Sequence, residues 1–312
     1  MLFARYNRPM RTFFSEKKNW VFVLLIAVSL FAVIFIAPVV PPAIDWHTVF
    51  RPAAINVING RSPYLVAGYY YPPWAILPLI PFAFFPEEIG RVFLLILALG
   101  VFAYVANKLG ASKIALVALL LSPLVLHEVL NGNIDWLVVL GLIFPPWLGL
   151  FFAVIKPQVG IGLIVFWLFF AWKDGGVKKV IRTFAPVTIA YGLSLVIFGF
   201  WPLAASKSLD LWWNANLWPV PIPVGAEEIW RLQTIVNSSL WPVSIPVGLA
   251  LLVTALRKND IRYAMAASPT LSPYVLFHSW VIVLLAIVAS TPETVAVVIG
   301  LWILVLIRLM GG

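Results

Sequence analysis

Long apolar runs separated by short polar segments dominate this chain. A helix needs about 20 apolar residues to cross a hydrocarbon core of about 30 Å. Runs close to that length cover residues 20–40, 70–85, 92–107, 114–130, 136–155, 157–172, 183–201, 234–256, 263–290 and 294–307. Proline pairs such as Pro72-Pro73 and Pro145-Pro146 interrupt some of them. The pattern predicts an all-α, polytopic transmembrane protein with about 8–10 membrane helices, including re-entrant or broken ones.

No polar stretch is long enough for a separate soluble domain, so we expect residues 1–312 to form a single integral membrane domain. Residues 1–19 form a predicted cytoplasmic basic tail, 41–70 a first outer loop and 202–233 a second outer loop. The run at 20–40 exceeds the apolar core of a signal peptide and is not followed by a small-residue cleavage site. It is therefore interpreted as a retained anchor.

Composition and charge agree with a membrane protein. The chain is 62% hydrophobic and 11% charged, whereas soluble domains have about 45–50% apolar and about 25% charged residues. The net charge of +9 comes from basic clusters at 5–18, 173–182 and 257–262 that flank apolar runs, which is typical of cytoplasmic flanks and not of a nucleic-acid surface. A multi-pass protein of the plasma (inner) membrane with a cytoplasmic N-terminus is predicted, with no nucleic acid as a partner.

Asp45 is the leading catalytic candidate because it follows a membrane-length apolar run. Carboxylates in such positions are costly and are usually functional. A general base is the functional interpretation, and a residue that merely ends a helix is the alternative. If the runs at 70–85 and 136–155 enter the membrane and return, then Asp45, the loop 131–135 and Lys156 share the outer face.

Other polar residues beside apolar runs are candidates for binding. Lys156, Arg51 and Arg231 are expected to bind a phosphate, although Arg51 is equally suited to lipid phosphates. The candidate substrate-binding residues are Tyr64, Tyr71, His127, Glu128, Asn131, Asn133, Asp135, Gln158 and His278. The tyrosines also suit an interfacial aromatic belt, and His278 also suits a structural role.

Metal and nucleotide chemistry have little support in the sequence. Cysteine is absent, and glycine-rich phosphate loops and His-Glu-x-x-His segments are missing. His127 and Glu128 with Asp45 or Asp135 are a conceivable set of ligands for a divalent ion, but no metal-ligand spacing supports it. No metal and no cofactor is therefore assigned.

Several ordered segments resemble glycosyltransferase family 87, the polyprenol-phosphate-mannose-dependent α-mannosyltransferases of the C-type glycosyltransferase fold. The opening segment has Asp45, Phe50, Ala53-Ala54, Gly60, Pro63-Tyr64 and Tyr71-Pro72-Pro73-Trp74. Asn131-Gly132-Asn133, Ile155-Lys156-Pro157 and Ser272-Pro273-Tyr274 through His278 follow in the family's order. Asn133 replaces a Gln of the family's central segment, and Ser279 stands where an acidic residue is common.

The resemblance implies an inverting enzyme that transfers one sugar, mannose by resemblance, from a polyprenyl-phosphate-sugar donor to a hydroxyl of a lipid-linked or glycan acceptor. It implies a catalytic Asp45, a donor phosphate near Lys156 and a cavity that opens outward among membrane lipids. A glycan ligase, a phosphosugar lipid-carrier transferase, a secondary transporter and a non-catalytic membrane subunit remain open as alternatives.

Overall fold

The structure is a computed structural model that describes residues 31, 35, 43–203 and 238–311. The chain divides into two units, Met1–Val40 and Pro41–Gly312, and every element below belongs to the second. All of these elements are helices, in agreement with the predicted all-α class. The basic tail, nearly all of the run at 20–40, most of the second outer loop and Arg231 lie outside the described residues.

The segment after Asp45 forms short helical pieces. These are η2 (Trp46–Phe50), α2 (Arg51–Ile58), η3 (Pro63–Leu65), η4 (Pro73–Leu79) and α3 (Ile80–Ala83). Proline lies in the first turn of the last four, where its missing N–H costs nothing. The predicted break in the run at 70–85 is therefore confirmed, because η4 and α3 together are too short to span a membrane.

Five helices follow: α4 (Glu87–Lys108), α5 (Lys113–Leu120), α6 (Pro123–Asn131), α7 (Asp135–Gly141) and α8 (Pro146–Ala153). Ser112 and Ser122 cap α5 and α6 by accepting hydrogen bonds from the N–H groups of Ala115 and Val125. The run at 136–155 is divided between α7 and α8, and α8 begins at Pro146, as the proline pair predicts.

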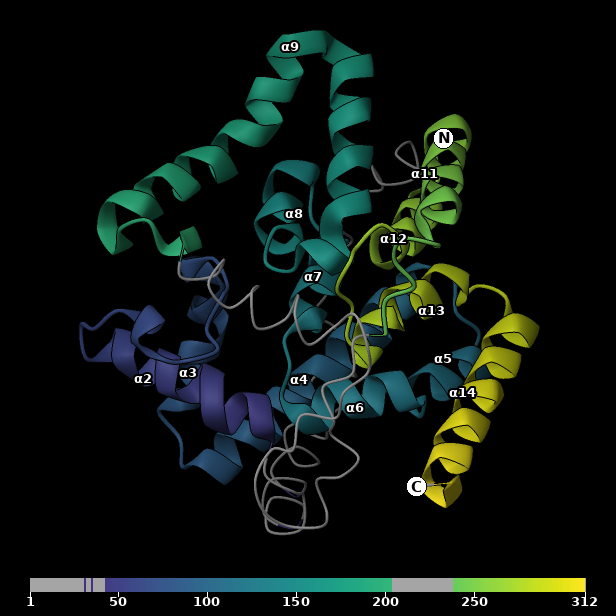
Figure 1. The fold of residues 1–312 in the computed structure, drawn as a ribbon, viewed down its shortest axis with the longest axis horizontal. Coiled ribbons are helices and arrows are strands. Elements are labelled where there is room, and N and C mark those ends of the chain that lie inside the picture. The colour runs from purple at the N-terminus through teal and green to yellow at the C-terminus, as the bar shows by residue number, and fades with distance from the viewer. Residues whose placement is uncertain (1–30, 32–34, 36–42, 204–237, 312) are drawn as a thin grey trace, which may run out of the picture. The chain divides into compact units, whose positions relative to one another are not determined.

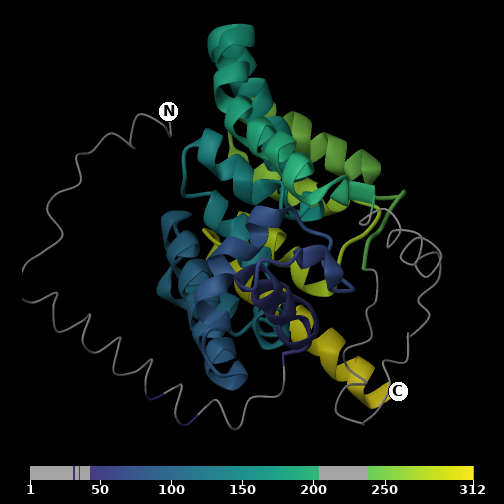
Figure 2. The same ribbon diagram turned by 90° about the vertical axis from the view of Figure 1, so that its left-hand side faces the viewer.

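Helix α9 (Pro157–Phe198) contains the expected run at 157–172 and most of the run at 183–201. At Gly175 and Gly176 the backbone leaves helical geometry, and Gly176 has a positive φ of 57°. Figure 1 shows the ribbon rising, turning sharply and descending, and the turn lies beyond α8 in both Figure 1 and Figure 2. Two helical arms therefore flank a turn that carries Lys173, Lys178, Lys179 and Arg182.

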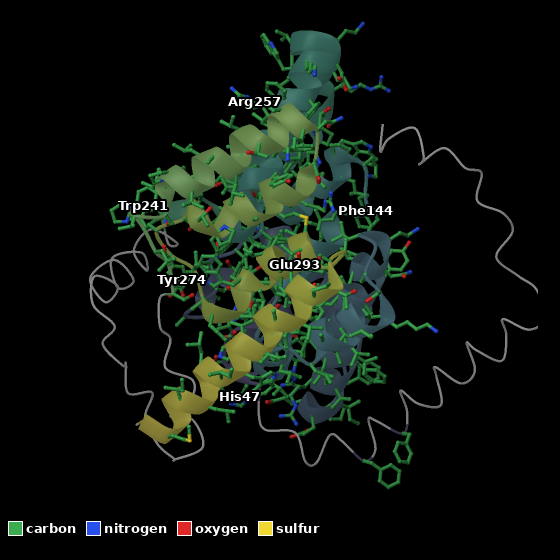
Figure 3. The ribbon with its side chains drawn as sticks, turned by 90° about the vertical axis from the view of Figure 1, so that its right-hand side faces the viewer. His47, Phe144, Trp241, Arg257, Tyr274 and Glu293 are labelled. Carbon is green, nitrogen blue, oxygen red and sulfur yellow. The ribbon has the colours of Figure 1, made fainter. Side chains whose placement is uncertain are left out.

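The C-terminal part comprises α11 (Ile245–Lys258), α12 (Ile261–Thr270), η6 (Phe277–Trp280), α13 (Val281–Ile287) and α14 (Thr291–Gly311). The run at 263–290 is broken between α12 and η6, where Ser272-Pro273 stands. Arg257, near the end of α11, lies toward the turn of α9, and His47 lies at the opposite end of this unit (Figure 3).

Close backbone approach brings α9 against its neighbours. A Cβ at Gly160 would lie 2.1 Å from the carbonyl oxygen of Ala153, and one at Gly162 would lie 2.0 Å from that of Ala264. Small residues allow membrane helices to pack this tightly. These contacts fix the start of α9, and with it Lys156, against α8 and α12.

Among the described residues, fewer helices are long enough to span a membrane than the sequence predicts. Among the described helices, α4 and α9 are long and apolar enough to span a membrane, and α5 with α6, bent by 49°, makes a third candidate. The expectation of eight to ten is corrected for the described part of the chain, where prolines and turns cut several of the apolar runs into pieces shorter than a bilayer. The described chain thus has two helices, or three if the bent pair counts as one, that are long and apolar enough to span a membrane; α9 is counted once here although its turn divides it into two arms.

Candidate active site

Asp45 lies immediately before η2 and its side chain is partly exposed. Its Oδ2 accepts a hydrogen bond of 2.6 Å from Nδ2 of Asn133. Burial raises the pKa of the Asp45 carboxyl above its ordinary value, and the Lys156 ammonium and the Asn133 amide only partly offset this shift. The site therefore holds an oriented carboxylate that takes up a proton more readily than a free aspartate.

The loop between α6 and α7 reaches Asp45 because Gly132 allows a tight approach. Gly132 has a φ of 67°, and a Cβ there would lie 2.7 Å from the Cβ of Trp46. Only glycine meets both conditions without strain. The Asn-Gly-Asn segment, which alone is an ordinary turn signal, thus places Asn133 on the Asp45 segment.

Asn133 joins the two leading candidates. Its Oδ1 accepts from the Lys156 ammonium and, at 2.7 Å, from the N–H of Ile134. Two donors on the oxygen leave the amide nitrogen to face Asp45, which fixes the orientation of the side chain. Asp45 and Lys156, 111 positions apart in the numbering, therefore share one buried amide.

Lys156 is fully buried at 1% exposure, and its ammonium pairs with Oδ1 of Asp135 as well as with Asn133. Its Nζ also lies 5.9 Å from the centre of the Tyr71 ring, within the range of a cation–π contact. A buried ammonium needs such partners to offset lost hydration. The predicted phosphate counter-ion is thus held inside the protein, with its charge shared by Asp135.

A second polar group lies behind Asp135. Oδ2 of Asp135 accepts a hydrogen bond of 2.6 Å from the hydroxyl of Ser279 and lies 3.7 Å from Nε2 of His278. The same Nε2 lies 3.5 Å from Oε2 of Glu128, whose Oε1 accepts from the N–H of Trp136. Glu128, Asp135 and His278 are all buried and come from α6, α7 and η6.

His127 lies on the outer side of this group and is partly exposed. Its Nδ1 is 3.2 Å from Nδ1 of His278, and the two rings stack with centres 5.3 Å apart. Nδ2 of Asn131 lies 3.1 Å from the same atom of His127. Polar contacts therefore run from Asp45 through Asn133, Lys156, Asp135 and His278 to His127.

The remaining predicted residues lie apart from these contacts. The Arg51 guanidinium approaches the carbonyl of Phe85 at 3.5 Å and the carboxylate of Glu87 at 4.0 Å. Tyr64 donates to the carbonyl of Tyr71 at 2.8 Å and stacks on Trp201. Gln158 is partly exposed in the first turn of α9. Arg51 is thus placed at the α3–α4 junction, and Tyr64 supports the backbone of Tyr71.

Ser279 is a site residue that the sequence interpretation did not include. Its hydroxyl fixes one oxygen of Asp135, while Lys156 holds the other. The signal available was its position directly after His278. In glycosyltransferase family 87, which the sequence resembles, an acidic residue is common at this position. Here Ser279 instead donates a hydrogen bond to the Asp135 carboxylate.

Glu128, Asp135 and His278 also form a possible metal centre. One ligand atom from each lies within 4.8 Å of the other two. This set differs from the one weighed from the sequence, because His278 takes the place of His127.

Comparisons of the chain with protein-family models, with curated proteins and with solved structures found no match. The function is therefore inferred from the geometry of the site and from the sequence segments that carry the resemblance.

Proposed function

We propose that this protein is a membrane glycosyltransferase of the C-type fold that moves a single sugar, mannose by resemblance, from a polyprenyl-phosphate-sugar donor to a hydroxyl of a lipid-linked or glycan acceptor. The observation that carries the proposal is the partly exposed Asp45 carboxylate, which Asn133 orients and links to the buried charge of Lys156. It is the arrangement expected of an oriented general base in an apolar setting.

Asp45 would accept the proton of the acceptor hydroxyl as that oxygen attacks the anomeric carbon with inversion. General-base catalysis contributes typically 10²–10⁴-fold, and a pKa moved toward the working pH improves it. The leaving phosphate departs as an anion, so a second carboxyl to protonate it, as glycoside hydrolases require, is unnecessary. One carboxylate and a positive environment are therefore sufficient for the reaction.

Lys156 would act from behind Asn133. Its ammonium holds the amide that orients Asp45, and its charge, in a site of low dielectric, favours the negative charge that develops on the departing phosphate. Direct contacts to the donor would come from partly exposed side chains nearby, such as Tyr71 and His127. Arg51 and Arg231 remain proposed phosphate ligands.

The arrangement of charges along α9 supports an outward-facing site in the inner membrane. Lys156 immediately precedes the first arm of α9, and the basic turn begins at Lys173. Helical residues 157–174 span about 27 Å at about 1.5 Å per residue, close to one hydrocarbon core. With the basic turn on the cytoplasmic side, Asp45 and Lys156 would lie near the outer face.

A proton-coupled transporter is the second candidate, because the polar contacts run continuously from Asp45 to His127. Buried titratable chains of this kind serve as proton relays in transporters. The broken helices are common to both classes. A phosphosugar lipid-carrier transferase or a glycan ligase would use the same fold and the same outer site.

Transfer of radiolabelled sugar from polyprenyl-phosphate-mannose to a panel of lipid-linked and glycan acceptors by the purified protein separates these functions. We expect one labelled sugar per acceptor, with the anomeric configuration inverted. Multi-sugar or phosphosugar products would indicate one of the related transferases. Absence of any product, together with substrate uptake into proteoliposomes driven by a proton gradient, would replace the proposal with a transporter.

A further inference from the structure

We propose that Glu128, Asp135 and His278 bind one divalent transition-metal ion, of the Zn²⁺ or Mn²⁺ type, beside the Asp45 site. This proposal does not depend on sugar transfer, because it concerns a separate group of buried side chains. Nε2 of His278 lies 3.5 Å from Oε2 of Glu128 and 3.7 Å from Oδ2 of Asp135. Ligands about 2.1 Å from a tetrahedral ion are about 3.4 Å apart, which is close to these separations.

Two of the converging atoms are buried without a hydrogen-bond partner. Oε2 of Glu128 and Nε2 of His278 have none among the described residues, and the two side chains are 0% and 2% exposed. Buried polar atoms are almost always satisfied, so an orphaned pair that points at one place indicates a missing partner. A cation between them would satisfy both.

The contacts around the two histidines are compatible with the tautomer that a metal ligand needs. Nδ2 of Asn131 lies 3.1 Å from Nδ1 and 3.3 Å from Nε2 of His127, and Nδ1 of His127 lies 3.2 Å from Nδ1 of His278. With its proton on Nδ1, His278 directs the lone pair of Nε2 at the two carboxylates, and its second ring nitrogen has a neighbour, as in many metal sites.

The outer contacts fix each carboxylate for the same task. Glu128 receives the N–H of Trp136 on Oε1, which leaves Oε2 directed at His278. The Oδ1 atom of Asp135 forms an ion pair with the Lys156 ammonium, and its Oδ2 atom accepts a hydrogen bond from the Ser279 hydroxyl. The carboxyl groups of Asp45, Glu128 and Asp135 share one buried ammonium, that of Lys156, and a divalent ion would add positive charge beside Glu128 and Asp135.

The mixed ligand set limits the choice of ion. Imidazole favours Zn²⁺ and other transition metals, whereas carboxylates favour Mg²⁺, Ca²⁺ and Mn²⁺. One imidazole with two carboxylates therefore suits Zn²⁺ or Mn²⁺ better than Mg²⁺, which prefers an oxygen shell with several waters. Lys156 meets Asp135 on Oδ1, so Oδ2 remains directed at the metal position.

The test is metal binding by the full chain, purified in detergent and freed of metal with a chelator. The protein is dialysed to equilibrium against Zn²⁺, Mn²⁺ or Mg²⁺, and its metal content is measured by inductively coupled plasma mass spectrometry. We expect about one Zn²⁺ or Mn²⁺ per chain. The variants E128Q and H278Q should bind at least about 10-fold more weakly. Glu293→Gln, which changes an exposed glutamate in the first turn of α14, is the matched control and should bind as the wild type does.

Size-exclusion profiles and melting temperatures establish that the variants are folded. If they are not, X-ray absorption of the loaded wild type decides, since the proposed site requires one nitrogen and two oxygens from the protein at about 2.0–2.2 Å. A wild type that retains no ion overturns the proposal. Full binding by folded E128Q and H278Q overturns it, and so does a shell without imidazole nitrogen.

Discussion

At the scale of single residues, Asn133 determines how Asp45 is presented. Its amide oxygen accepts a hydrogen bond from the Lys156 ammonium, and its amide nitrogen donates a hydrogen bond of 2.6 Å to the Asp45 carboxylate. A hydrogen bond to the charged form of a carboxylate favours that form. Asn133 is therefore a positioning residue, whose effect is transmitted through the Asp45 carboxylate.

Replacing Asn133 by Ala should lower the rate of sugar transfer by about 10²-fold, since Asp45 would lose its orientation. It should also raise the pKa of Asp45 further, because the donor that stabilises the carboxylate is gone. Asn133→Gln keeps an amide and should restore part of the rate. Initial rates for all three proteins check this, and equal rates for wild type and Asn133→Ala would contradict the positioning role.

The pH dependence of transfer follows from the raised pKa of Asp45. The base works only when it is deprotonated, so activity should fall as the pH drops through its pKa. Because that pKa is raised in the protein, the acid limb should lie above the value of about 3.9 for a free aspartate. Rate–pH profiles measure the limb, and Asn133→Ala should move it to higher pH. A limb at or below the ordinary value would be inconsistent with the assignment.

The sequence supplied most members of the site but not their pairing. Asp45, Asn133, Lys156 and His278 were each predicted from their position beside apolar runs. The pairing of Lys156 with Asp135 was not, because it depends on how the start of α9 packs against α7. The role of Arg51 at the phosphate stays a prediction; its described contacts are with Glu87 and Phe85, at the α3–α4 junction.

At the scale of helices, the packing of α9 on α12 holds Lys156 in place. Gly162 lies against the backbone of Ala264, and its N–H donates to the hydroxyl of Ser268 at 3.0 Å. The proline pairs Pro72-Pro73 and Pro145-Pro146 correctly predicted where two of the apolar runs break. Local residue types specify such breaks, but they do not specify how many of the resulting pieces cross a membrane.

Gly162→Ala should destabilise the protein by about 1–3 kcal/mol, because a Cβ would clash with the Ala264 carbonyl and helices α9 and α12 would move apart. Gly192→Ala is the matched control in the same helix. A Cβ there has no atom within 4 Å, so it should be neutral or slightly stabilising. Thermal unfolding in detergent compares the two, and equal melting temperatures would argue against this helix contact.

At the scale of the whole described unit, the basic turn of α9 and the segment that carries His47 lie at different ends. The basic turn of α9 and Arg257 lie toward one end, and His47 lies toward the other (Figure 3). Positive residues mark the cytoplasmic side of membrane proteins. The number of crossings could not be read from hydropathy alone, because α7 and α8, like η4 and α3, are apolar pieces shorter than a bilayer.

The absence of cysteine from the sequence makes this orientation testable. Single cysteines at His47 and Lys178, both exposed, should differ in their reaction with a membrane-impermeant maleimide applied to intact cells. We expect label on His47→Cys at once, and on Lys178→Cys only after the membrane is permeabilised. If only Lys178→Cys is labelled in intact cells, the protein has the opposite orientation. If both cysteines are labelled equally, the two positions do not lie on opposite sides of the membrane.

The most direct measurement of the proposed function is sugar transfer by Asp45→Asn. The substitution keeps the size of the side chain but removes the base, so transfer should fall by about 10²–10⁴-fold while the protein remains folded and binds the donor. Asp174→Asn, which changes an exposed carboxylate paired with Lys179 in the turn of α9, is the matched control and should keep full activity. Wild-type turnover by folded Asp45→Asn would contradict the role of Asp45 and, with it, the proposed mechanism.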